Sequence, residues 1–117
     1  MGFIVTCGEK EIWNPSLTVG KLYFDQIMSI EKIIDVISGV TSPFDDELEI
    51  NREEFKEFID ISLKFIQNSN NSALIAMLSG CLEVSIYLNF LIAGIWVETP
   101  FELRFLNERA KGIANLA

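Results

Sequence analysis

The chain has 117 residues, with 9 Lys and Arg against 17 Asp and Glu, no His and 2 Cys, and its formal net charge is −8. This length suits one hydrophobic core, so we expect residues 1–117 to form a single domain. The acidic balance argues against nucleic-acid binding, which needs clustered Lys and Arg to displace counterions. The lack of His removes the commonest general base and the commonest metal ligand.

The N-terminal segment, residues 3–13, is rich in apolar and β-branched residues on either side of Gly8. This composition predicts extended chain, with two short strands as one form of it. The segment has neither a basic start nor a long apolar stretch, so it does not resemble a secretory leader. We therefore expect a cytoplasmic protein in which Cys7 and Cys81 stay reduced.

Three segments show the period of an amphipathic helix, namely residues 21–38, 51–67 and 100–111. Gly39 is placed to end the first helix in a left-handed cap. Asn51 and Glu54 have the spacing of a capping box at the start of the second. Thr99 is expected to cap the third, and Gly112 to end it. Residues 39–50 are expected to form a loop.

Residues 73–97 carry a single charge, Glu83, and are otherwise mostly apolar. Their length and their Ala, Leu and Met content favour a buried central helix, although residues 82–92 also alternate as a strand would. We expect a mainly α fold, a compact bundle of about four helices with a short extended N-terminal segment. The alternative is an α+β fold with a strand at 82–92.

A membrane span over residues 73–97 is a further alternative, because the stretch is long and apolar enough. Glu83 and Asn89 lie near its middle, where polar groups are costly. No Lys or Arg occurs between Lys64 and Arg104 to anchor its ends. We therefore favour the buried helix.

The acidic charge is concentrated in one stretch. The sixteen residues from Asp45 to Asp60 contain eight acids and two cations, so they carry −6 of the net charge of −8. A helix dipole accounts for acids in the first helical turn, but Asp45, Asp46 and Glu47 precede the predicted helix. We expect a docking surface for a basic protein, with Phe44 as an apolar anchor. The expected partner-binding residues are Phe44, Asp45, Asp46, Glu47, Glu49, Glu53, Glu57 and Asp60.

The sequence contains no recognisable catalytic or metal-binding motif. Glu83 is expected to be buried and to take Tyr87 as its hydrogen-bond partner, which is a structural role. Neither cysteine has a His to activate it. Ile50 argues against a calcium loop after Asp45, because it stands where such a loop requires Gly. We expect no enzyme activity, no catalytic residues, no cofactor and no metal.

A short single domain with an acidic face at Asp45–Asp60 resembles the small acidic immunity proteins of bacterial toxin systems, including polymorphic and contact-dependent inhibition systems. The resemblance implies a protein that binds and occludes a cognate basic toxin domain, with a nuclease as the favoured kind. One alternative is a small acidic secretion or assembly chaperone, or an adaptor, that acts as a homodimer. Another is a small membrane-associated protein that spans the bilayer with residues 73–97.

Overall fold

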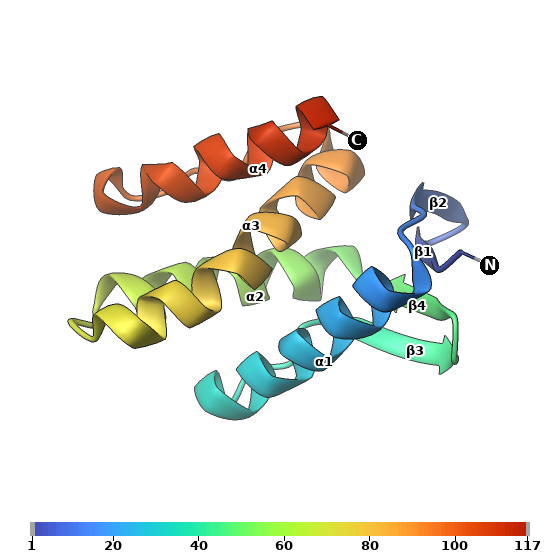
Figure 1. The fold of residues 1–117 in the computed structure, drawn as a ribbon, viewed down its shortest axis with the longest axis horizontal. Coiled ribbons are helices and arrows are strands. Elements are labelled where there is room, and N and C mark those ends of the chain that lie inside the picture. The colour runs from blue at the N-terminus through green and yellow to red at the C-terminus, as the bar shows by residue number, and fades with distance from the viewer. Residues whose placement is uncertain (1, 117) are drawn as a thin grey trace. The chain divides into compact units, whose positions relative to one another are not determined.

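The computed structural model describes the backbone of residues 2–116 and the side chains of residues 2–113. The chain divides into two compact units, Met1–Phe58 and Ile59–Ala117, and one helix runs through the division. Figure 1 shows the order of the elements along the chain. They are β1 (Ile4–Cys7), β2 (Lys10–Trp13), α1 (Leu17–Ile34), β3 (Val40–Phe44), β4 (Glu47–Ile50), α2 (Arg52–Gln67), α3 (Ser72–Ala93), the 3-10 turn η1 (Phe101–Leu103) and α4 (Arg104–Leu116).

The fold is α+β, so the prediction of a mainly α helical bundle is wrong. The segment 39–50, predicted to be a loop, forms the β3–β4 hairpin, and the extended segment 3–13 forms β1 and β2. All four strands join in one sheet. The alternative strand at 82–92 is also wrong, because those residues lie within α3.

The sheet of the first unit has the strand order β2-β1-β4-β3. β1 runs parallel to β4, and the other two pairs are antiparallel. Val5 lies beside Leu48, and both are buried, as the alternation of a half-covered sheet requires. Thr6 lies beside Glu49 on the opposite face. The sheet therefore has one apolar face and one face that carries polar and acidic side chains.

α1 begins and ends earlier than the sequence predicts. Its N-terminal cap is Ser16, whose Oγ accepts a hydrogen bond from the Val19 N–H at 3.3 Å. It ends at Asp35, which adopts a left-handed conformation with φ of 56°. Gly39, with φ of 77°, instead leads the chain into β3. The exposed apolar side chains of the first turns, such as Val19, hide the true start from a periodicity argument.

α3 confirms the predicted helix but ends at Gly94, whose φ of 78° closes it in the left-handed conformation. Its buried polar side chains include Ser85 and Asn89. The Ser85 hydroxyl donates to the Cys81 carbonyl at 2.9 Å, so its burial is compensated. α3 is long and apolar enough to cross a membrane, and half of its most apolar window is buried in the structure. A core helix of a globular protein has the same properties.

α4 packs against α3 in the second unit, with Leu106 and Ala110 on its buried face. The predicted Thr99 cap is wrong, because the 3-10 turn η1 precedes α4 and begins without a side-chain cap. Thr99 Oγ1 instead accepts a hydrogen bond from Asn107 Nδ2 at 3.1 Å. The same Nδ2 donates to the Val97 carbonyl at 2.7 Å, which ties the connecting loop to α4.

Candidate protein-docking surface

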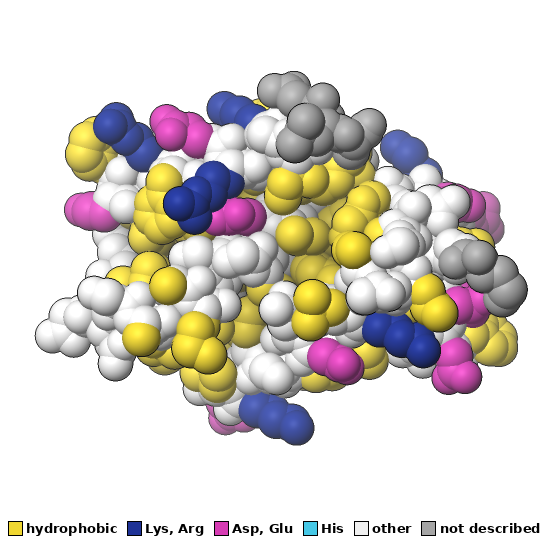
Figure 2. Space-filling view, in the orientation of Figure 1, with side chains coloured by type: hydrophobic (Ala, Val, Ile, Leu, Met, Phe, Trp, Pro, Cys, Tyr) yellow, Lys and Arg dark blue, Asp and Glu magenta, His cyan; other side chains and the backbone are white. Residues whose placement is uncertain are grey.

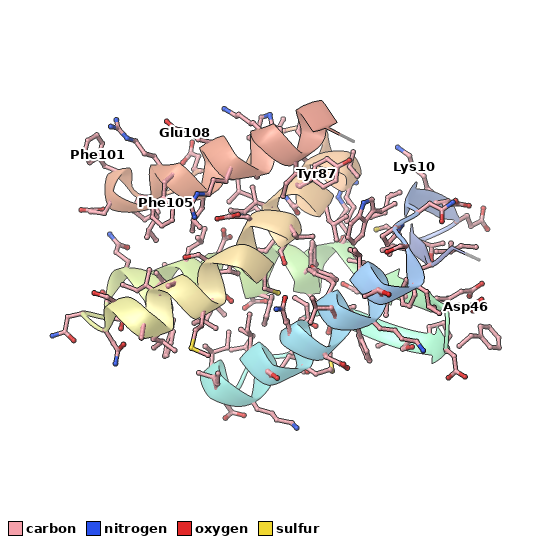
Figure 3. All side chains as sticks on the ribbon, viewed as in Figure 1. Lys10, Asp46, Tyr87, Phe101, Phe105 and Glu108 are labelled. Carbon is pink, nitrogen blue, oxygen red and sulfur yellow. The ribbon has the colours of Figure 1, made fainter. Side chains whose placement is uncertain are left out.

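The acidic side chains that follow Phe44 lie on the β3–β4 hairpin. Asp45 and Asp46 form its turn, and Figure 3 shows Asp46 at the end of the hairpin. In β4, Leu48 and Ile50 are buried, so strand alternation places Glu47 and Glu49 on the opposite face. We call these four carboxylates the hairpin acids: Asp45, Asp46, Glu47 and Glu49. Figure 2 shows Asp and Glu side chains at the surface on the side of the strands, and others over the helices.

Phe44 lies beside the hairpin acids and is 67% exposed. It pairs with Glu47 across the hairpin, after a shift of register between Thr41 and Phe44. The Ser42 hydroxyl lies 2.9 Å from the Phe44 carbonyl and 3.2 Å from the Glu47 carbonyl, so it holds the two strands together at this shift. The aromatic ring is thus presented to solvent from a fixed backbone.

The hairpin acids have no cation within ion-pair distance among the residues that the structure describes. Glu11 adds a further carboxylate, because it pairs with Thr6, which pairs in turn with Glu49 on the same outer face. Sequence reasoning missed Glu11, since only the pairing of β1 with β4 brings it to this face. Unpaired carboxylates on one face produce a negative potential that attracts a cationic partner.

The acids of α2 form a separate group. Glu53 and Glu57 are exposed and lie one turn apart on α2, which begins after the end of β4 remote from the hairpin turn. Asp60 lies beyond the division between the units and is half-buried. It lines a hollow of about 370 Å³ with Lys64 and Glu98. The structure therefore brings Phe44 and the hairpin acids together, whereas Asp60 belongs to the other unit.

Glu83 has a partner other than the predicted one. Its Oε1 lies 3.1 Å from Nη1 of Arg109, 26 residues further along the chain, and the Glu83 side chain is only 14% exposed. The prediction of a bond to Tyr87 is wrong. The guanidinium of Arg109 also lies over the ring of Phe105, 5.3 Å from its centroid. Figure 3 shows Phe105 below α4. Glu83 therefore lies in a neutralised pair that joins α3 to α4.

The two cysteines are poorly suited to nucleophilic chemistry. Burial raises the pKa of the Cys81 thiol to about 12, against an effect of the Ser85 hydrogen bond that lowers it. Burial also raises the pKa of Cys7, opposed by the charge of Arg52. A raised pKa leaves little thiolate at neutral pH. Within the described part of the chain, no group of three or more Cys, Asp and Glu could hold a metal ion.

Comparison with known proteins gives one informative result. A protein-family model described as a family of unknown function, DUF6086, matches residues 1–115. No curated protein and no solved structure matches the chain. The matched range includes the whole first unit, and therefore the whole sheet and the hairpin, and all but the last two residues of the second unit.

Proposed function

The chain belongs to the DUF6086 family of unknown function, and from the geometry of its sheet we propose that it acts by binding a basic protein through the β3–β4 hairpin. One observation carries this proposal. The strongly exposed ring of Phe44 stands next to four carboxylates that have no cationic partner among the described residues. An aromatic anchor beside charged groups is the arrangement that concentrates binding energy in protein interfaces.

Phe44 and the hairpin acids would contribute different parts of the binding. A phenylalanine ring buries 150–250 Å² in an interface, so covering the exposed part of Phe44 contributes about 2–4 kcal/mol. The carboxylates contribute mainly to the rate of encounter and to the choice of partner. The carboxylates thus select a basic surface, and burial of the Phe44 ring slows dissociation of the complex.

An inhibitor of a basic toxin is the form of this function that fits the chain best. A toxin nuclease has a positively charged cleft that receives phosphates, and the hairpin presents carboxylates that could occupy such a cleft. This proposal corresponds to the resemblance to immunity proteins and rests on charge complementarity. Blocking a cleft requires no catalytic group on this chain.

The experiment titrates this chain by calorimetry with the purified protein that the neighbouring gene encodes, which the proposal requires to be basic. We expect the affinity to fall at least about tenfold between roughly 50 and 300 mM salt, because the attraction is electrostatic. Asp45→Lys with Asp46→Lys should weaken binding on the order of 100-fold, because like charges then face each other. Phe44→Ala should weaken it by at least about tenfold.

The matched control is Glu102→Lys with Glu108→Lys, which changes the net charge equally on two exposed residues of the second unit. Figure 3 shows Glu108 on α4. We expect this variant to bind within about threefold of the wild type, because it leaves the hairpin unchanged. If the hairpin variant binds as well as the wild type, the hairpin is not the docking surface. Equal weakening by both double variants would mean that only net charge matters.

A further inference from the structure

A groove runs beside β3 in the first unit. It has a volume of about 410 Å³ and lies between α1 and β3, with Gly39 at the entry to the strand. Its apolar walls include Phe24 and Met28 of α1, one turn apart, and Ile37, which is 63% exposed. Carboxylate side chains also line it, from Glu31 and Glu54. The groove thus combines apolar depth with negative charge.

The strand beside this groove has a free backbone edge. β3 is the last strand in the order β2-β1-β4-β3. The Gly39 carbonyl accepts from the Asn51 N–H at 2.8 Å on the β4 side. Since backbone groups alternate along an antiparallel strand, the N–H and carbonyl of Val40 point to the outer edge.

Part of that edge is already occupied and part is open. The Val40 N–H donates to the Ser38 Oγ at 3.1 Å. The Val40 carbonyl points to the same outer edge, where β3 has no neighbouring strand in the order of the sheet. A backbone acceptor on an edge strand is a group that an added strand would use.

We propose that an extended segment of the basic partner pairs with the outer edge of β3 at Val40 and places apolar side chains in the groove. This inference rests on the proposed function and adds the mode of binding. In such strand addition, main-chain hydrogen bonds give affinity and pockets for alternate side chains give specificity. A segment that alternates apolar and cationic residues fits, because the apolar side chains enter the groove and the cations meet carboxylates.

Two observations favour a cationic segment over an uncharged one: the carboxylates in the groove, and the continuation of β3 into the hairpin acids. The groove itself contains the carboxylates of Glu31 and Glu54. The strand that borders the groove continues into Phe44 and the hairpin acids. A cationic segment that pairs with β3 would therefore extend along the surface to which the proposed function assigns the partner.

Two features limit the pairing to a short stretch. Pro43 has no N–H to donate, and the register shifts between Thr41 and Phe44. Such features restrain an edge strand from uncontrolled pairing. Affinity must then come from the groove and the acids together with a few backbone bonds, which makes the pairing selective for a matching partner.

The opposite edge of the sheet is less suitable. β2 begins at the exposed Lys10, which Figure 3 shows at the end of the β1–β2 hairpin. A lysine on an edge strand discourages pairing, and here it would also repel a basic segment. Its charge opposes the partner that the β3 edge attracts.

The experiment uses three synthetic peptides as probes, each with alternating Arg and Val and blocked ends. One is unmodified, one is N-methylated at every Val, and one is N-methylated at every Arg. Along an extended strand, successive N–H groups point to opposite edges, so each methylated peptide loses the donors of one edge. We expect the unmodified peptide and one methylated peptide to bind, and the other to bind at least about tenfold more weakly.

Substitutions at the groove give a second readout. Ile37→Lys should weaken binding, because it places a cation at the groove, whereas Ile33→Lys, at an exposed isoleucine of α1 that does not line the groove, should not. The two substitutions change the charge equally, but only one of them lies at the groove.

The outcomes separate this inference from the proposed function. Equal binding of all three peptides would overturn strand pairing and leave acidic docking intact. Failure of all three to bind at low salt would also overturn strand pairing, while the titration with the basic protein decides the proposed function. If the unmodified peptide binds the Asp45→Lys, Asp46→Lys variant as it binds the wild type, the hairpin acids do not select the partner.

Discussion

The ring of Phe3 lies directly on the backbone of Gly20, so a Cβ atom at position 20 would fall 2.3 Å from Cγ of Phe3. Phe3 is buried, and its N–H donates to the Pro15 carbonyl at 2.9 Å, which fixes the chain just before β1. α1 can therefore pack closely against Phe3, because Gly20 has no side chain at the point of contact. The closeness of this approach depends on a glycine within a helix.

Gly20→Ala should destabilise the protein by about 1–3 kcal/mol, because the new methyl group overlaps the Phe3 ring and forces it to move. Helix propensity alone would have the opposite effect, because it favours Ala over Gly by about 1 kcal/mol. The free energy of unfolding in urea measures the effect. A Gly20→Ala variant as stable as the wild type would show that α1 can shift away from Phe3 without loss.

Gly80→Ala is the matched control, because a Cβ atom there would meet nothing within 4 Å. Gly80 is exposed within α3, and only propensity acts on it. We expect this variant to be more stable than the wild type by about 0.5–1 kcal/mol. The two substitutions should therefore shift the urea midpoint in opposite directions.

Asp35 ends α1 in a left-handed conformation that asparagine and glycine adopt more readily than aspartate. Its negative charge also lies at the helix C-terminus, where the helix dipole is negative. Asp35→Gly should stabilise the protein by about 0.5–1 kcal/mol and Asp35→Asn by a few tenths. Thermal unfolding measures both. Asp25→Asn, on an exposed helical residue of α1, should leave the midpoint unchanged, and an equal gain there would assign the effect to net charge.

Ser38 joins the end of α1 to the start of β3. Its N–H and its Oγ both donate to Oε2 of Glu31, at 2.8 and 2.5 Å, and its Oγ accepts from the Val40 N–H. Ser38→Ala should cost about 1–3 kcal/mol of stability, because Ser38 is buried and the Val40 N–H loses its acceptor. Ser42→Ala removes an exposed hydroxyl of the same strand and should cost less than about 1 kcal/mol. Similar losses in urea unfolding would contradict this account.

Local signals in the sequence were sufficient for α2 and α3. Asn51 Oδ1 accepts from the Glu54 N–H at 3.0 Å, which confirms the predicted cap of α2. Asn71 caps α3 in the same way, through the Leu74 N–H. Residues 82–92 fitted a strand equally well, because most of them are buried within α3 whichever way they point. None of residues 82–92 is exposed, and periodicity of apolar residues cannot distinguish a helix from a strand in such a stretch.

The remaining features depend on contacts between distant residues. The parallel pairing of Val5 with Leu48 joins segments more than forty residues apart, and four-residue strands are too short to show a period. Charge density revealed the hairpin acids, whereas Glu11, the open edge of β3 and the groove beside it follow only from the order of the strands. For the same reason the sequence could not connect Glu83 with Arg109.

Cys81 should make the stability of the protein depend on pH in the alkaline range. Its thiol has a pKa of about 12 in the folded protein, against 9.0 for an unperturbed thiol, because it is buried. Below pH 9 the Cys81 thiol is protonated in the folded and in the unfolded protein, so its contribution to the free energy of unfolding is fully present. Above pH 9 the unfolded thiol ionises first, so this contribution is lost as the pH rises toward 12. The slope approaches about 1.4 kcal/mol per pH unit where only the unfolded thiol is ionised.

The measurement is the difference in free energy of unfolding between the wild type and Cys81→Ala, determined in urea from neutral pH to about pH 11. The Lys and Tyr titrations are common to both proteins and cancel in the difference. We expect the advantage of the wild type to shrink above pH 9, because only the wild type loses stability through this thiol. Cys7→Ala should give a shallower change, since Cys7 is only partly buried and Arg52 opposes the rise in its pKa. Parallel curves for the wild type and Cys81→Ala would mean that the Cys81 thiol ionises as easily in the folded protein as in the unfolded chain.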